Sequence, residues 1–202
     1  MKIIGINASP RKKANTQTLV ETVLEGASEK GAETRVVHLR ELNINGCLGC
    51  EGCKKQLGKC VQKDDLTTLM QDMATCDAVV LGTPVYWFQV SAQFKILVDR
   101  LYSFLQTSEN PETGQPDFKS AFPADRKFVF IISRGDPEPP PMFGQLYDNL
   151  NEWLALLPLS LGAGHYEFFH QYGAGLDRKT AQNDASLLEK ARATGKGLVQ
   201  SG

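Results

Sequence analysis

The chain lacks any apolar run long enough to cross a membrane, since its longest apolar stretches have only the length of a strand. It also lacks an excess of charge of one sign, because 22 basic residues stand against 23 acidic ones. A nucleic-acid partner normally requires a strongly basic stripe. No apolar segment with a cleavage site precedes the first predicted strand, so a secretory signal is not expected. We therefore expect a cytoplasmic protein with neither a nucleic-acid nor a membrane partner.

Several catalytic motifs are missing as well. The sequence contains no G-x-S-x-G nucleophile elbow, no Walker A sequence and no G-x-G-x-x-G fingerprint. These absences argue against a serine hydrolase, an ATPase and a dinucleotide-fold dehydrogenase. The three histidines, His38, His165 and His170, are scattered and do not pair at metal-ligand spacing, so we expect them in core or surface roles.

Apolar segments of strand length alternate with amphipathic segments of helix length. The predicted strands cover 2–7, 33–39, 77–83, 127–133 and 158–162, and the predicted helices cover 15–30, 64–74, 91–106, 142–156 and 178–199. This alternation predicts an α/β, flavodoxin-like three-layer sandwich with a five-stranded parallel sheet of order 2-1-3-4-5. We expect a single domain over 1–202, with a cysteine-rich loop at 43–63 and a polar insertion at 108–125 that serves as a spacer.

The turn after the first predicted strand is suited to a phosphate. It reads Ser9-Pro10-Arg11-Lys12-Lys13-Ala14-Asn15-Thr16 and leads directly into a helix. Free backbone N–H groups and the helix dipole favour an anion at such a helix N-terminus. Because no second glycine-rich motif is present, the turn predicts one phosphate monoester, as in a mononucleotide such as FMN. Further donors are available on the side chains of Ser9, Arg11, Asn15, Thr16 and Thr18.

Three consecutive aromatic residues follow the third predicted strand, in the run Gly82-Thr83-Pro84-Val85-Tyr86-Trp87-Phe88. Open α/β sheets bind their ligands beyond the carboxyl ends of the strands, where this run lies. Such residues can pack over the sheet, or they can form the wall that a flat tricyclic ring requires. Because the phosphate turn is expected at the adjacent strand end, the run favours a flavin site.

Four of the five cysteines, Cys47, Cys50, Cys53 and Cys60, are close together in the sequence. A disulfide framework usually spreads its cysteines more widely, and in a reducing compartment such a group is more often metal-binding or redox-active. Cys-x₂-Cys-x₂-Cys spacing lets three thiolates converge on one small object, and a fourth closes the coordination shell. The fifth, Cys76, precedes a buried strand and is expected to be an ordinary buried thiol.

Ser9-Pro10-Arg11 with Asn15-Thr16, and Pro84-Val85-Tyr86 followed by Lys95 and Asp99-Arg100, resemble the NADPH-dependent FMN reductase family of flavodoxin-like proteins. The resemblance is good over about residues 1–105. It implies an FMN phosphate at Ser9, Arg11, Asn15, Thr16 and Thr18, with the isoalloxazine against Pro84, Val85, Tyr86, Trp87 and Phe88. Members of this family commonly carry a third flavin-side loop of small residues after strand four.

In this chain the third loop reads Ser133-Arg134-Gly135-Asp136, and Arg134 and Asp136 depart from the small-residue pattern. Arg134 can contact the N1–O2 edge of the flavin or a pyridine-nucleotide phosphate. Alternatively, it is a surface arginine paired with Asp136.

The cysteine spacing resembles that of the iron–sulfur flavoproteins within the same family. This resemblance implies a [4Fe–4S] cluster held by Cys47, Cys50, Cys53 and Cys60 that passes single electrons to FMN. Two alternatives stay open: thiols that are free or form a redox disulfide, and a zinc site with four cysteines.

The resulting prediction is an FMN-dependent oxidoreductase. It implies NAD(P)H or ferredoxin as electron donor and quinones, flavins or nitro- and azo-aromatics as acceptors. One alternative is an iron–sulfur flavoprotein that carries electrons between protein partners, and another is a regulatory thiol or zinc protein. The resemblance also implies a homodimer or homotetramer, with the cysteine loop and the insertion at 108–125 as candidate contact surfaces.

Overall fold

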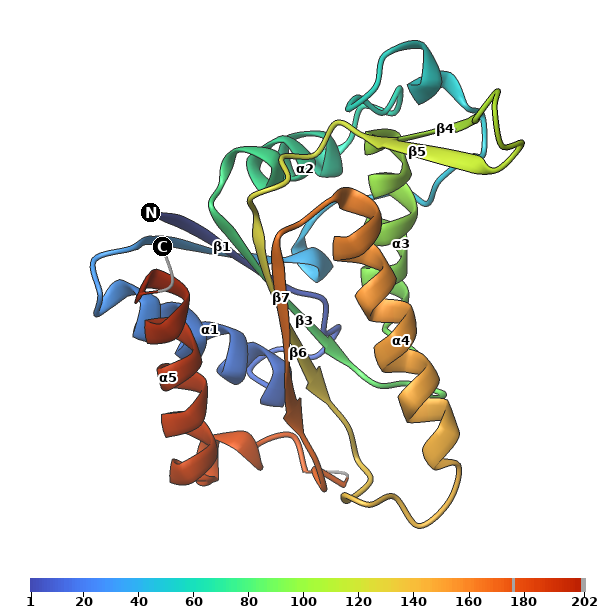
Figure 1. The fold of residues 1–202 in the computed structure, drawn as a ribbon. Helices are drawn as coiled ribbons and strands as arrows, with labels where there is room; N and C mark the ends of the chain where they lie inside the picture. Colours follow the sequence, from blue (N-terminus) through green and yellow to red (C-terminus); the bar gives the residue numbers. More distant parts are fainter. Residues whose placement is uncertain (176, 201–202) are drawn as a thin grey trace.

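A parallel five-stranded sheet forms the centre of the computed structural model, which describes residues 1–175 and 177–200 (Figure 1). Its strands are β1 (Lys2–Asn7), β2 (Glu33–His38), β3 (Ala78–Pro84), β6 (Lys127–Ser133) and β7 (His165–Gln171). They lie in the order β2-β1-β3-β6-β7, and every neighbouring pair is parallel. Counted along this sheet alone, the order is the predicted 2-1-3-4-5.

Helices cover both faces of the sheet and complete the predicted three layers (Figure 1). One face carries α1 (Asn15–Ser28) and α5 (Ala185–Gln200), and the other carries α2 (Asp65–Thr75), α3 (Ala92–Leu101) and α4 (Gly144–Leu161). Helices α1 and α5 pack closely, because a Cβ added at Gly195 would lie 1.9 Å from the carbonyl oxygen of Val23. Among the described helices, none has both the length and the apolar character of a membrane span.

The two faces of the sheet have separate apolar cores, as expected for strands buried on both sides. The first core joins strand residues such as Ile6 and Phe130 to the buried faces of α2, α3 and α4. The second joins Val80 and Ile131 to α1 and α5. Alternating side chains of one strand therefore supply both cores, since successive residues point to opposite faces.

The predicted fifth strand at 158–162 is wrong. These residues form the end of α4, whose buried positions Leu150, Leu154 and Leu161 follow helical spacing, with Pro158 inside the last turns. The fifth strand of the sheet is instead β7, which reads HYEFFHQ and is only partly buried. Because β7 is an edge strand, it carries polar residues that conceal it in a search for apolar runs.

The segment predicted as a polar spacer at 108–125 contains most of an antiparallel hairpin, β4 (Leu105–Glu109) with β5 (Pro116–Ser120). The hairpin projects away from the central sheet (Figure 1). The third helix was therefore predicted too long, because α3 ends at Leu101 and a 3₁₀ turn (Tyr102–Phe104) leads into β4. The last helix was predicted to begin at 178, but α5 begins at Ala185 after a loop and a second short turn (Ala181–Asn183).

Candidate functional site

Four loops meet around a cavity of about 270 Å³ at the carboxyl edge of the sheet. They follow β1, β3, β6 and β7, so the cavity lies where an open α/β sheet binds its ligands. Its lining comprises Ser9, Arg11, Ala14, Asn15, Thr16, Pro84, Val85, Tyr86, Ser133, Arg134, Gly135, Ala174, Gly175, Asp177 and Arg178. The tertiary structure thus brings together all three segments that the sequence analysis selected, and adds a fourth.

The N-terminus of α1 opens onto this cavity without a cap. Its N-cap residue is Ala14, which makes no side-chain hydrogen bond, and the first turn holds no acidic residue. The first amides of a helix have no partner within the helix itself, so they are available to an anion. Buried Ser9 and Thr16 and exposed Arg11 lie beside these amides and contribute hydroxyl groups and a positive charge.

Asn15 and Thr18 bind protein groups rather than facing the cavity with free side chains. The Asn15 amide donates to the carbonyl oxygen of Asp177 at 2.9 Å and accepts from the backbone N–H of Ala181 at 3.0 Å. Thr18 Oγ1 accepts from Gln182 Nε2 at 3.1 Å, and Thr18 is absent from the cavity lining, so its predicted place at the phosphate is not supported. Both residues fasten the loop after β7 onto α1.

The aromatic run after β3 is only partly in the cavity. Pro84, Val85 and Tyr86 line it, whereas Trp87 is 94% exposed and does not line the cavity. Trp87 and Phe88 have φ of 51° and 60°, and reciprocal hydrogen bonds between Tyr86 and Gln89 close the turn around them. Positive φ is uncommon in aromatic residues and is concentrated at ligand sites and switch regions. Trp87 and Phe88 are absent from the cavity lining, so a flavin contact by these two residues stays a prediction.

Arg134 is buried in the cavity wall with an exposed fraction of only 5%. Its guanidinium lies 4.1 Å from the ring centroid of Tyr147 and 4.4 Å from that of Tyr172, in cation–π geometry. It forms an ion pair with Glu138, so the alternative of a surface arginine paired with Asp136 is wrong, and the two ligand contacts stay predictions. The Arg134 Nε atom is buried without a hydrogen-bond partner among the residues that the structure describes.

Asp136 instead accepts a hydrogen bond from the Tyr147 hydroxyl. Burial and this carboxylate together raise the pKa of Tyr147 to about 12, so the phenol keeps its proton at neutral pH. Phe88 packs edge-on against Tyr147, with ring centroids 5.3 Å apart. The loops after β3 and β6 are thereby joined to α4 through one aromatic cluster.

Sequence reasoning missed the fourth loop, which contributes Ala174, Gly175, Asp177 and Arg178 to the cavity. Arg178 is a second exposed arginine that lines the cavity together with Arg11. The signal was the Gly173-Ala174-Gly175 run, since glycines directly after a strand often mark a ligand loop. It went unrecognised because β7 itself was misplaced.

The cysteine loop lies elsewhere, against α3 and the hairpin side of the molecule. Cys47 and Cys50 are exposed, Cys53 and Cys60 are half-buried, and all four are free thiols. Four thiols that form no disulfide fit a tetrathiolate site in number and chemistry. The Gly49 N–H donates to Cys47 Sγ at 3.4 Å, in the manner of amide contacts to ligand sulfurs. Among the described residues, however, no three metal-binding side chains are gathered closely enough to hold a metal.

The structure confirms the prediction that Cys76 is an ordinary buried thiol. It is 6% exposed, and its Sγ donates to the carbonyl oxygens of Met73 and Ala78. Burial raises its pKa to about 11, so the thiol stays protonated and unreactive at neutral pH.

Comparisons with solved structures support the fold. An NAD(P)H:quinone oxidoreductase from Methanothermobacter marburgensis superimposes with a TM-score of 0.77 over 98% of this chain and 96% of its own, at 20% sequence identity. An FMN-dependent NADH-azoreductase from Bacillus anthracis, solved with FMN, has a TM-score of 0.71 over 98% of this chain and all of its own, at 13% identity. At these identities the similarity establishes the α/β architecture alone.

Sequence comparisons are more specific. An iron–sulfur flavoprotein of Archaeoglobus fulgidus is 30% identical over 94% of this chain and 80% of its own length. An iron–sulfur flavoprotein of Methanocaldococcus jannaschii is 44% identical over 50% of this chain, but this match spans only 51% of that protein, and another from Archaeoglobus fulgidus is matched over 48% of its length. The family model described as "NADPH-dependent FMN reductase" matches residues 1–132. These matches confirm the resemblance read from the sequence, and the chain belongs to the NADPH-dependent FMN reductase family.

Proposed function

We propose that this protein is an FMN-dependent oxidoreductase whose cofactor binds in the cavity at the carboxyl edge of the sheet. The observation that carries the proposal is the uncapped N-terminus of α1, which opens onto a cavity also lined by the loops after β3, β6 and β7. Family membership supports FMN as the cofactor and a flavin-dependent redox reaction. FMN supplies the electron-transfer chemistry, and the protein supplies binding, orientation and electrostatics.

The phosphate of FMN would be held by the first amides of α1 with Ser9, Arg11 and Thr16. Asn15 acts there through its backbone, while its side chain holds the loop that carries Asp177 and Arg178. Charge-assisted hydrogen bonds to a phosphate are stronger than neutral ones, which makes Arg11 and Arg178 the principal charged contacts.

The ring system would lie between the loops after β3 and β6. Pro84, Val85 and Tyr86 supply one wall, and Ser133, Arg134 and Gly135 supply the other. Arg134 is held in place by Tyr147, Tyr172 and Glu138, so its charge occupies a fixed position in that wall. A fixed positive charge stabilises negative charge at the polar edge of a ring or on an incoming pyridine nucleotide.

The electron donor is NAD(P)H or ferredoxin in this proposal, and the acceptor is a quinone, a flavin or a nitro- or azo-aromatic compound. The structural neighbours include an NAD(P)H:quinone oxidoreductase and an FMN-dependent NADH-azoreductase, and the name of the family includes NADPH. An acceptor of this kind is flat and apolar, and it would approach through the open side beside Tyr86.

A second candidate function is electron transfer between proteins by an iron–sulfur flavoprotein. Two observations favour it: the four free thiols, and relatives whose names describe iron–sulfur flavoproteins. Cys47, Cys50, Cys53 and Cys60 would hold the [4Fe–4S] cluster, which supplies one-electron chemistry when bound. Because no three thiols are gathered in this structure, cluster assembly would have to draw the loop together.

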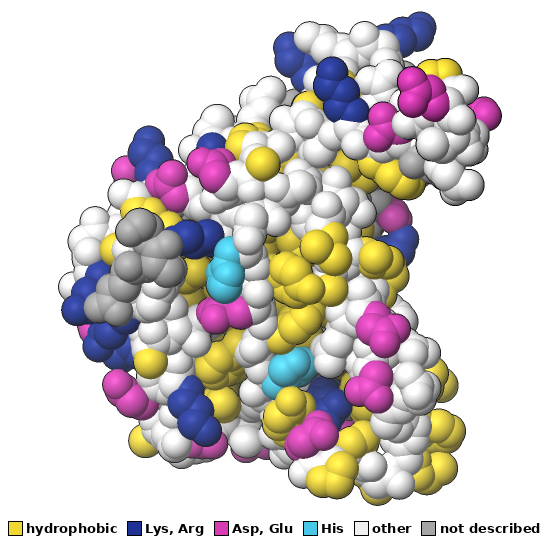
Figure 2. Space-filling model, viewed as in Figure 1, with side chains coloured by type: hydrophobic (Ala, Val, Ile, Leu, Met, Phe, Trp, Pro, Cys, Tyr) yellow, Lys and Arg dark blue, Asp and Glu magenta, His cyan; other side chains and the backbone are white. Residues whose placement is uncertain are grey.

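Self-association is part of the same proposal. Figure 2 shows apolar side chains gathered between the hairpin and α4, and Phe118, Leu156 and Leu159 are among the exposed ones. A cavity of about 510 Å³ lies there between Phe118 and Leu159, and a second of about 520 Å³ lies between the cysteine loop, α3 and α4. Both candidate contact surfaces named from the sequence border these cavities, which supports a homodimer or homotetramer in this proposal.

The test is an FMN titration followed by turnover with NAD(P)H. Arg11→Ala is expected to weaken FMN binding by about 10- to 100-fold, the loss typical of one charged hydrogen bond. Lys12→Ala is the matched control, since Lys12 is equally exposed in the same turn but does not line the cavity. Wild-type protein that takes up no FMN would overturn the proposal, whereas FMN uptake without NAD(P)H oxidation would favour the electron-carrier function.

A further inference from the structure

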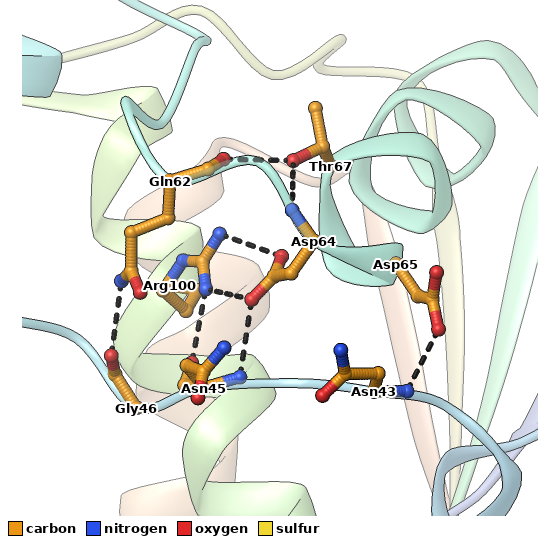
Figure 3. A network of polar contacts seen from close by, with 8 residues as sticks. All are labelled: Asn43, Asn45, Gly46, Gln62, Asp64, Asp65, Thr67 and Arg100. Atoms are coloured by element: carbon orange, nitrogen blue, oxygen red, sulfur yellow. Dashed lines mark hydrogen bonds and ion pairs between the residues drawn. The ribbon is translucent and has the colours of Figure 1, made fainter.

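A buried ion pair lies at the base of the cysteine loop (Figure 3). Arg100, on α3, donates from Nη1 to Asp64 Oδ2 at 2.7 Å and from Nη2 to Asp64 Oδ1 at 3.0 Å. Their side chains are only 0% and 3% exposed. A two-point contact of this kind fixes both the distance and the orientation of its partners.

The same pair binds the two ends of the loop to each other. Before Cys47, the Asn45 carbonyl oxygen accepts from Arg100 Nη1 at 2.9 Å, and the Asn45 N–H donates to Asp64 Oδ2 at 3.0 Å. After Cys60, the Gln62 amide donates to the Gly46 carbonyl oxygen at 2.9 Å. Figure 3 shows that these contacts lie between the segment that enters the loop and the segment that leaves it. We call this set of contacts the clasp.

Electrostatics keep the clasp charged. Burial opposes ionisation of both partners, but the hydrogen bonds between them hold the pKa of Asp64 below its usual range and that of Arg100 above it. The Cys60 thiol is a further neighbour of the Arg100 guanidinium. Arg100 Nε is buried and has no hydrogen-bond partner among the described atoms. Three of the five guanidinium N–H groups bind Asp64 and Asn45, so Nε–H and the second N–H of Nη2 take no part in the clasp.

The middle of the loop is also anchored, through a backbone amide and a lysine side chain. Gly58 donates its N–H to the Ser103 carbonyl oxygen at 2.8 Å, and Lys54 Nζ donates to the Tyr102 carbonyl oxygen at 3.0 Å. Cys47 and Cys50 remain exposed, and no three thiols gather. The clasp is therefore made of protein groups alone and uses none of the four cysteine sulfurs.

We propose that Arg100 is a positioning residue for the cluster that the proposed function assigns to the four cysteines, an inference that rests on that function. Through Asp64 and Asn45 it fixes the separation between the start of the loop at Cys47 and its end at Cys60. One of its two remaining N–H groups would donate to the neighbouring Cys60 sulfur once that sulfur is a metal ligand. Hydrogen bonds to ligand sulfurs tune both the affinity and the reduction potential of such clusters.

The test compares wild-type protein with Arg100→Gln, Arg100→Lys and Asp64→Asn, each loaded with FMN and reconstituted anaerobically with ferrous iron and sulfide. The readouts are iron and sulfide per chain, resistance to an iron chelator and the midpoint potential of the cluster. We expect about 10- to 100-fold weaker iron retention in Arg100→Gln and Asp64→Asn, the range typical of lost partners behind a metal ligand. Arg100→Lys keeps the charge but loses the planar two-point contact, so partial retention with a shifted potential is expected.

Arg35→Gln is the matched control, because Arg35 pairs with Asp72 on an exposed surface away from the loop. Iron retention and a potential equal to this control in all three variants would overturn the inference. Wild-type protein that binds FMN but no iron would instead overturn the cluster itself.

Hydrogen exchange of wild-type protein before iron is added tests the clasp without any variant. The Asn43 and Asn45 amides, which donate to Asp65 and Asp64, should exchange much more slowly than the amides of residues 47–51. Equal exchange across these residues would show that the clasp does not hold and would overturn the inference even if a variant fails to fold.

Discussion

The cavity at the strand ends and the cysteine loop differ in how completely the protein assembles them. The cavity is bordered by four loops that leave strands of one continuous sheet, and cross-links such as those of Asn15 fasten the loops to each other. The cysteine loop is held at its base and at two points of its middle, while its thiols stay apart. The first region is lined by loops in fixed positions, whereas the second would need the proposed cluster to bring its thiols together.

The physical reason for this difference is the source of the constraint. Strand ends inherit their positions from ladder hydrogen bonds and two apolar cores, whose formation accompanies folding itself. A loop of exposed thiols has no core, and gathering it costs conformational entropy that only a bound metal or cluster offsets. Arg100 and Asp64 lower that cost by fixing the ends beforehand.

The largest expected effect separates two cysteines. Cys50→Ser should abolish the cluster absorbance of reconstituted protein while FMN remains bound, because one ligand of the tetrathiolate site is lost. Cys76→Ser should leave the cluster intact, since its thiol is buried and only donates to the carbonyl oxygens of Met73 and Ala78. Visible absorbance with iron and flavin analysis gives the readout. Equal cluster content in the Cys50→Ser and Cys76→Ser variants would show that Cys50 is not a ligand of the cluster.

A smaller effect is expected from Gly82→Ala, which tests the rigidity of the preformed region. A Cβ at this position would lie 2.4 Å from Val20 Cγ2 and 2.9 Å from Thr16 Cγ2, so α1 must shift away from β3. The free energy of unfolding should fall by about 1–3 kcal/mol, as overpacked cores do, and FMN affinity should weaken with it. Gly46→Ala, in the cysteine loop, has open space around the new methyl group and should change neither quantity. Denaturant unfolding and flavin titration measure both, and equal effects at the two glycines would contradict the comparison.

The smallest effect concerns Tyr147, in the cavity wall. Its pKa is raised to about 12, so between its unfolded value near 10 and this value the folded state holds a proton that the unfolded state has lost. The stabilisation is complete below pH 10 and is lost as the pH rises toward 12. Tyr147→Phe should flatten this alkaline decline, by less than about 3 kcal/mol because solvent screens the site. Free energies of unfolding measured between pH 10 and 12 for both proteins would show this difference. The same decline in the variant as in the wild type would mean that other groups cause the loss of stability.

The parts of the fold that the sequence predicted correctly are those with strong local signals. Strands β1 and β6 were placed with correct bounds, since both are continuous apolar runs of a doubly buried sheet. The turn at residues 9–16 was placed correctly between β1 and α1 because a polar stretch separates an apolar strand from an amphipathic helix, while its role at a phosphate stays a prediction. Strand β7 was missed because an edge strand alternates polar and apolar residues, and the apolar end of α4 was mistaken for it.

The candidate site was predictable in the same uneven way. Ser9, Arg11, Thr16, Pro84, Val85 and Tyr86 reach the cavity as predicted, because each lies within a few residues of a strand end. Trp87 and Phe88 do not line it, since a turn with positive φ directs them elsewhere. The pairing of Arg134 with Glu138 depends on the path of a proline-rich loop, which no local pattern specifies.

The sequence by itself determined the parallel α/β sheet, the strand–helix turn at residues 9–16 and the close spacing of the four cysteines, because periodicity, turn chemistry and residue type are local properties. Only the tertiary structure decided which side chains share a cavity, that the loop after β7 belongs to it and that Arg100 reaches Asp64 beneath the cysteines. Those contacts join residues as far apart as Asn15 and Asp177. They exist because packing of the two cores fixes the elements in space. The number of residues between two positions does not determine the distance between them in the folded chain.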